Sequence, residues 1–257
     1  MPRAESLYRC WHVLWELTRC EFKLRDQGSV FGFCWTLLYP AAMFASLYLI
    51  FGGWIGRDVP GYGSFLLVGL LQWNFFVSAT SNALTSLRRK APLIKNFSFP
   101  RGLIVISSVL VVGLSYALEM GVLALLLVLV GTPVTWTWAL VPALSALLFL
   151  WALGLGFALA LLGLEFIDTE RLWSLGTHVG FFATPVFYAT DALPPGIRDW
   201  LWLNPLAQFL AAFRACLLEG RPPWASLASL ALWATVLALA GGWLFARRSP
   251  AIGERLR

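Results

Sequence analysis

Six long apolar stretches constrain what this chain can fold into more than any other feature. They are Phe31–Ile55, Ser64–Leu84, Leu103–Val130, Thr137–Leu164, Leu172–Tyr188 and Ala225–Phe245. A helix that crosses the roughly 30 Å hydrocarbon core of a bilayer needs about 20 mostly apolar residues, so the stretches predict six transmembrane helices. Only 12% of the residues are charged, whereas a soluble domain usually carries about 25%. We therefore expect an all-α integral membrane protein with a single membrane domain over residues 1–257.

The region between the fifth and sixth stretches has a different pattern. A further apolar piece, Leu206–Leu218, follows the short fifth stretch, and the connection contains Pro194, Pro195, Gly196 and Pro205. A proline inside a helix removes a backbone hydrogen bond and clashes with the preceding turn. Because unpaired backbone is not tolerated against lipid, we expect short re-entrant helices that dip into the outer leaflet and return.

The basic residues are distributed unevenly between the predicted loops. With the N-terminus inside, the outer segments contain only four of the 19 lysines and arginines: Arg57, Arg198, Arg214 and Arg221. The positive-inside rule then places both termini in the cytoplasm. Residues 1–30 become a cytoplasmic interfacial segment, residues 31–245 the membrane domain and residues 246–257 a cytoplasmic tail. Since the topology splits the basic residues among loops, they form no continuous patch for nucleic acid.

Two cytoplasmic elements are not predicted to span the membrane. Residues 5–23 have the pattern of an amphipathic helix, which would lie in the plane of the interface among membrane lipids. Its apolar face carries Trp11, Leu14, Trp15 and Phe22. We expect it to anchor the first span, and its polar face could also meet a cytoplasmic partner.

The second cytoplasmic element is the loop 87–100. Its charges are all basic and alternate with apolar side chains: Arg88, Arg89, Lys90, Leu93, Ile94, Lys95, Phe97 and Phe99. The positive-inside effect alone would explain the charges. A short amphipathic rod between two rigid spans would also suit a lever that receives force.

Catalytic motifs are missing from the chain. It has no Gly-x-x-x-x-Gly-Lys-Ser/Thr loop for nucleotide phosphates and no His-Glu-x-x-His, so we expect no catalytic residues, no metal site and no resident cofactor. Glu119 lies within the third span, where a charge is costly and is a functional hypothesis by default. It could contact substrate or a proton path, or bond to a neighbouring helix. Gln72 and Asn74 of the second span could likewise join helices or face an aqueous path.

Three stretches in order along the chain resemble permeases of the ATP-binding-cassette exporter family for polysaccharides, including O-antigen and teichoic-acid exporters. In the segment 25–40, the matching residues are Arg25, Gly28, Ser29, Gly32, Trp35 and Pro40. Tyr39 departs from the family, which often has Asn there. The segment 93–101 resembles the family's coupling helix and its entry to the third span. Late in the chain, the matching residues are Pro185, Asn204, Pro205 and Arg214.

The resemblance implies a homodimer around a central channel in a bacterial inner membrane, with two ATPase subunits below it. Those subunits, rather than this chain, would bind ATP and magnesium. The loop 87–100 would contact each ATPase, and a second contact would involve Glu165, Asp168, Glu170 and Arg171. ATP hydrolysis would then drive a glycan linked to undecaprenyl diphosphate outward.

Aromatic side chains on the first span suit such a channel, because flat apolar faces stack on sugar rings. With the polar residues of spans two and three, the channel-lining candidates are Phe33, Trp35, Tyr39, Phe44, Tyr48, Phe51, Gln72, Asn74 and Glu119. Ordinary packing or lipid contact would also explain the aromatic residues. The remaining alternatives are a permease for a drug, lipid or ion, a membrane-embedded lipid enzyme, and a scaffold that does not transport.

Overall fold

The computed structural model describes residues 2–25, 34–97, 99–201 and 203–255, and within these ranges every regular element is a helix. The α-helices are α1 (Pro2–Arg25), α2 (Cys34–Phe51), α3 (Tyr62–Arg89), α4 (Ala91–Asn96), α5 (Gly102–Leu129), α6 (Val141–Glu165), α7 (Thr169–Ala183), α8 (Pro195–Leu201), α9 (Pro205–Arg214) and α10 (Trp224–Arg255). The all-α fold expected from the sequence is confirmed.

Four helices in the described part of the chain are long and apolar enough to cross a membrane: Tyr62–Arg89, Gly102–Leu129, Trp136–Glu165 and Trp224–Ser249. They correspond to the second, third, fourth and sixth predicted spans. The other two predicted spans correspond to shorter helices, since the described apolar part of α2 is Leu38–Phe51 and α7 has 15 residues. α7 ends at Ala183, before the predicted end, because the residue preceding Pro185 is driven out of the helical conformation.

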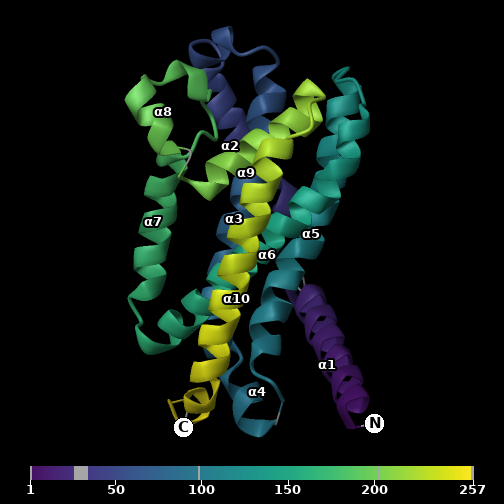
Figure 1. Cartoon of the computed structure of the whole chain (residues 1–257), viewed down its shortest axis with the longest axis vertical. Helices are drawn as coiled ribbons and strands as arrows, with labels where there is room; N and C mark the ends of the chain where they lie inside the picture. The colour runs from purple at the N-terminus through teal and green to yellow at the C-terminus, as the bar shows by residue number, and fades with distance from the viewer. Residues whose placement is uncertain (1, 26–33, 98, 202, 256–257) are drawn as a thin grey trace.

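α3 lies at the centre of the bundle, where it packs against α5, α6, α7 and α9. α10 packs along α6, and two glycines allow their backbones to meet. A Cβ atom on Gly154 would lie 2.6 Å from the backbone nitrogen of Ala238, and Gly241 meets the backbone of Gly154 in return. Small residues permit this close approach between membrane helices. Figure 1 shows α10 in front of the bundle and α7 as a separate column to one side.

α1 projects from the lower end of the bundle (Figure 1) and packs on α5. Thr18 is buried, whereas Trp11 and Trp15 of the predicted apolar face are exposed and Leu14 and Phe22 are half-buried. The predicted helix is therefore present and slightly longer than expected. Its exposed tryptophans are available to a membrane interface.

One buried arginine holds the segment that follows α7. Arg214, at the end of α9, donates to the carbonyls of Pro185 (2.7 Å) and Val186 (2.6 Å), and its Nε donates to the carbonyl of Phe65 (3.3 Å). Its guanidinium lies 3.4 Å from the centroid of the Phe65 ring. Gly69 makes room for the guanidinium, because a Cβ there would lie 2.5 Å from Nη2. Backbone carbonyls that the helix break leaves unpaired thus find donors within the protein, as a low-dielectric surrounding requires.

The start of α9 completes the same cluster. Asn204 is the N-cap: its Oδ1 accepts from the Leu206 backbone nitrogen (3.0 Å), and its Nδ2 donates to Thr184 Oγ1 (3.0 Å). Pro205 occupies the first helical position, where its missing N–H costs nothing. The four late residues of the family resemblance therefore lie together around the break between α7 and α9.

Candidate functional site

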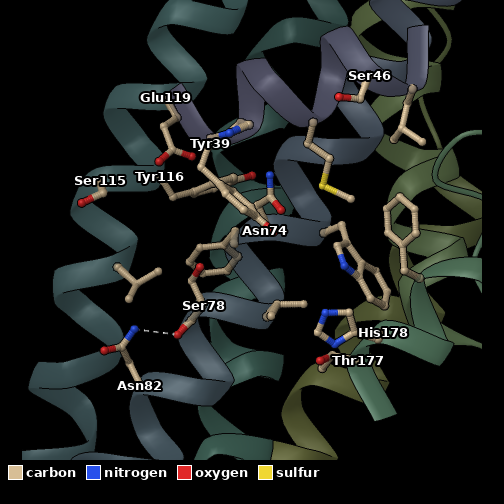
Figure 2. A pocket seen from close by; sticks show the side chains of 18 of the residues that line it. Tyr39, Ser46, Asn74, Ser78, Asn82, Ser115, Tyr116, Glu119, Thr177 and His178 are labelled. Atoms are coloured by element: carbon tan, nitrogen blue, oxygen red, sulfur yellow. Dashed lines mark hydrogen bonds between the residues drawn. The ribbon is translucent and has the colours of Figure 1, made fainter. Parts of the chain in front are cut away.

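A cavity of about 690 Å³ lies between α2, α3, α5 and α7. Its polar lining residues are Ser46, Asn74, Ser78, Asn82, Ser115, Tyr116, Glu119, Thr177 and His178. Apolar and aromatic side chains, among them Met43, Trp73 and Phe181, line the rest. Figure 2 shows the polar groups converging from several helices. A space of this size, with scattered polar groups on an apolar wall, is typical of a binding site.

α3 contributes a polar stripe that runs along the cavity. Asn74, Ser78 and Asn82 are spaced four residues apart, so they share one helix face. The Asn82 amide donates to the Ser78 carbonyl (2.9 Å; Figure 2). The Asn74 amide nitrogen is buried and has no hydrogen-bond partner among the described residues. A buried unpaired donor beside a cavity is available to a ligand or to water.

α5 contributes Ser115, Tyr116 and Glu119. The Tyr116 hydroxyl donates to Gln72 Oε1 and lies 3.3 Å from Ser145 Oγ, so it joins α3, α5 and α6. Gln72 is fully buried and is absent from the cavity lining. Of the two roles open for Gln72 in the sequence, the structure places it in the contact between helices.

α7 contributes Thr177 and His178. The His178 Nδ1 lies 2.6 Å from the carbonyl of Ser174. A carbonyl can only accept, so Nδ1 carries the proton and Nε2 remains as a second polar atom of the ring. Within the described residues, no group of three His, Cys, Asp or Glu side chains is arranged to hold a metal ion.

The predicted channel-lining residues are placed in two regions. Tyr39, Asn74 and Glu119 line the cavity, as does Pro40 of the early motif. Phe44, Tyr48 and Phe51 instead form aromatic contacts toward the other end of α2. Phe44 stacks on Tyr48 (5.5 Å between centroids), Tyr48 on Tyr62 (6.2 Å) and Phe51 on Phe187 (5.2 Å).

Several residues predicted for the channel or for the early motif lie in parts of the chain that the structure does not describe. Phe33, Gly28, Ser29 and Gly32 lie outside the described residues, and the same holds for the side chains of Trp35 and Arg25. Their assignment to the channel or to the early motif stays a prediction.

Sequence reasoning did not single out Tyr116, Thr177 or His178. A signal was available for α7, because Ser174, Thr177 and His178 follow the i, i+3, i+4 spacing of one helix face. No comparable signal marks Tyr116, whose role depends on which helices pack around it.

A second pocket, of about 490 Å³, lies between the end of α7 and α8. Its lining residues include Phe182, Tyr188, Trp200 and Asn204. Phe182 lines both pockets, so its side chain forms part of the wall between them.

The loop 87–100, which the sequence predicts to act as a lever, contains the short helix α4 and its flanks. α4 has Pro92 in its first turn and ends at Asn96, and Phe97 is 64% exposed beyond it. Leu93 and Ile94 are half-buried and Lys95 is exposed. Phe99 is half-buried and packs against the core. Phe97 and Lys95 are therefore exposed at this loop, whereas Phe99 fixes the loop to the bundle.

The three basic residues before α4 differ in their surroundings. Arg88 is half-buried, Arg89 is exposed, and the Lys90 ammonium lies 2.7 Å from Glu21 of α1. Burial lowers the pKa of Lys90, and the neighbouring Glu21 opposes that shift. Lys90 therefore belongs to an internal contact rather than to an open basic surface.

The predicted second contact lies at the turn between α6 and α7. Glu165 pairs with Arg248 of α10 (3.4 Å), and the exposed Arg171 pairs with Asp168 (3.6 Å); Glu170 is exposed. Figure 1 shows this turn, α4 and the C-terminus at the same end of the molecule. Both predicted contacts therefore lie at the same end of the molecule.

Comparison with known proteins gives the class of this chain. Residues 12–218 match the ABC-2 type transporter family, and the chain belongs to that family of membrane permeases. Its relatives include an O-antigen export system permease protein RfbA from Klebsiella pneumoniae, 29% identical over 231 residues and 89% of each chain. A protein of the same name from Myxococcus xanthus is 27% identical over 256 residues and 98% of each chain.

Proposed function

We propose that this chain is the channel-forming permease of an ABC transporter that exports a lipid-linked, O-antigen-like polysaccharide across the bacterial inner membrane. ATP hydrolysis in a separate partner subunit drives the export. The observation that carries the proposal is the polar cavity between α2, α3, α5 and α7. The names of the relatives from Klebsiella pneumoniae and Myxococcus xanthus support the choice of cargo.

The chemistry of the cavity suits a sugar polymer. Asn74, Ser78, Asn82 and Thr177 provide amide and hydroxyl groups that can exchange hydrogen bonds with sugar hydroxyls. Tyr39, on the opposite helix α2, provides an aromatic ring with a polar tip, which can meet both the apolar face and the hydroxyls of a sugar. Beyond Phe182, the second pocket with Trp200 and Tyr188 continues the path toward the outer surface.

The working unit is a homodimer with two ATPase subunits. In it, α2 and α7 act as the first and fifth of six spans, and α8 and α9 form the re-entrant segment. α4 and the α6–α7 turn contact the ATPase from the cytoplasmic side, where both termini also lie. The common position of these elements at one end of the molecule supports this orientation (Figure 1).

Filling the cavity tests the proposal. Ser78→Phe places a bulky ring in the cavity, so export of glycan should stop while the complex with the ATPase still assembles and hydrolyses ATP. Leu239→Phe is the matched control, because Leu239 lies on the exposed face of α10. The measurement is the amount of glycan exported by cells that express each variant together with the cognate ATPase.

Two outcomes would contradict the proposal. If the wild-type chain purifies well folded but no ATPase associates with it, the claim that a partner ATPase drives export would be wrong. Wild-type levels of glycan export from Ser78→Phe would show that the polymer does not pass through this cavity.

A further inference from the structure

A compact polar network joins α1 to the junction between α3 and α4. Glu21 of α1 lies at its centre. Its Oε2 accepts from Lys90 Nζ (2.7 Å), and its Oε1 lies 3.3 Å from Ser108 Oγ and 3.5 Å from Arg89 Nη2. Lys90 Nζ also donates to Ser107 Oγ (2.9 Å) and Ser108 Oγ (3.2 Å) of α5.

The pair at the centre is largely shielded from water. The exposed side-chain fractions are 15% for Lys90 and 21% for Glu21. A shielded pair with additional hydrogen bonds is held more firmly than a surface pair, and losing one partner leaves the other charge buried. The network therefore ties α1 firmly to the α3–α4 junction and to the start of α5.

Lys90 connects this network to α4, because it lies between α3 and α4 in the sequence. Lys90 is at once the C-cap of α3 and the residue that precedes α4. Any displacement of α4 therefore pulls on Lys90, and through Lys90 on Glu21 and α1.

A second arm of the network leads to the cavity. Arg89, which pairs with Glu21, also donates to Asn82 Oδ1 (3.2 Å). Asn82 lines the cavity at the end of the α3 stripe. Glu21 thus contacts the residue before α4 directly, through Lys90, and reaches the cavity-lining Asn82 through Arg89.

We propose that Glu21 is a positioning residue that couples α4 to both α1 and the cavity, so that a displacement of the lever moves α1 and Asn82 together. This inference deepens the proposed function and rests on it. Glu21 keeps α1, the start of α4 and Asn82 in a fixed relation, so that all three move together when the ATPase displaces α4.

The first test removes the charge without changing the shape. In a complex with the cognate ATPase, Glu21→Gln should assemble and hydrolyse ATP, but glycan exported per ATP should fall about fivefold or more, the usual range for a coupling between sites. Glu16→Gln is the matched control, since Glu16 lies on the same helix, is exposed and takes no part in this network. Equal export per ATP from the two variants would overturn the proposal.

A double-mutant cycle separates coupling from general damage. Lys90→Met should lower export per ATP as Glu21→Gln does, and the double variant should be no worse than either single variant, because both changes break the same link. Lys90→Arg keeps the charge, so export per ATP should stay near the wild-type value, in contrast to Lys90→Met. Losses that multiply in the double variant would mean that the two residues act separately and would overturn the proposal.

A distance measurement on a chain with an intact network covers the case in which Glu21→Gln does not assemble. Spin labels at Glu16 of α1 and at the exposed Asn96 of α4 should keep their mutual distance when the complex binds ATP, while each moves relative to a label at Arg247 of α10. A change in the distance between α1 and α4 would overturn the proposal. Absence of any complex between wild-type chain and ATPase would instead contradict the proposed function.

Discussion

Arg214 shows most clearly how a single residue makes this fold possible. A buried cation is costly unless its donors are used, and this guanidinium uses three of them on backbone carbonyls. The fork geometry of arginine suits this task, whereas lysine is a compact point charge that cannot hold separated carbonyls in the same way. Arg214 therefore replaces the helical hydrogen bonds that the chain loses near Pro185.

We expect Arg214→Met to destabilise the protein by about 3 kcal/mol or more, because it leaves buried carbonyls unpaired. Thermal unfolding of the purified chain in detergent measures the change. Arg221→Met is the control, since Arg221 is exposed. Equal unfolding temperatures for the two variants would show that the carbonyls find other partners. Arg214→Lys should recover only part of the loss.

At the scale of elements, the structure separates two phenylalanines that the sequence treated alike. Phe97 is exposed beyond α4, whereas Phe99 packs against the core. A residue that meets a partner and a residue that anchors the loop must respond differently to truncation.

Phe97→Ala should therefore weaken the association with the ATPase, or its coupling to transport, without lowering the stability of the isolated chain. Phe99→Ala should lower that stability by about 1–3 kcal/mol, because it removes packed apolar surface. Pull-down with the cognate ATPase and thermal unfolding distinguish the two effects. The same unfolding temperature for Phe99→Ala and wild type would contradict the anchoring role.

The sequence was a good guide to elements and a poorer guide to the spaces between them. Apolar length located α3, α5, α6 and α10, and the prolines located the break after α7. The cavity could not be predicted in the same way, because it depends on how α2 and α7 stand against α3. Asn74 was singled out as a polar residue in an apolar span, but Gln72, two residues earlier, gives the same signal and lies in a helix contact. Asn74 and Gln72 lie on different faces of α3, and the sequence alone does not show which face meets the cavity and which meets a neighbouring helix.

At the scale of the whole molecule, the two ends differ in character. The turn between α6 and α7, α4 and the C-terminus lie at one end, and α8 lies at the other (Figure 1). Under the proposed orientation the first end faces the cytoplasm.

Labelling with a membrane-impermeant maleimide tests this orientation. Cys20 is exposed on α1, so it should react in inside-out vesicles but not in intact spheroplasts. Trp200→Cys, at a position 74% exposed on α8, should show the opposite pattern when the other cysteines are replaced by alanine. Labelling of both positions from the same side would show that α1 and α8 do not lie on opposite faces of the membrane.

The polar stripe of α3 has a consequence for how a long cargo would travel. Asn74, Ser78 and Asn82 recur once per turn, about 6 Å apart along the axis because the helix rises about 1.5 Å per residue. Each of them offers a short, uncharged polar side chain to the cavity. A polymer that advances by one unit would leave one of these side chains and meet the next. It would therefore exchange one polar contact for another at each step. Under the proposed function, the free energy of the polymer would then depend little on how far it has moved, so the length of the polymer would set no limit on its passage.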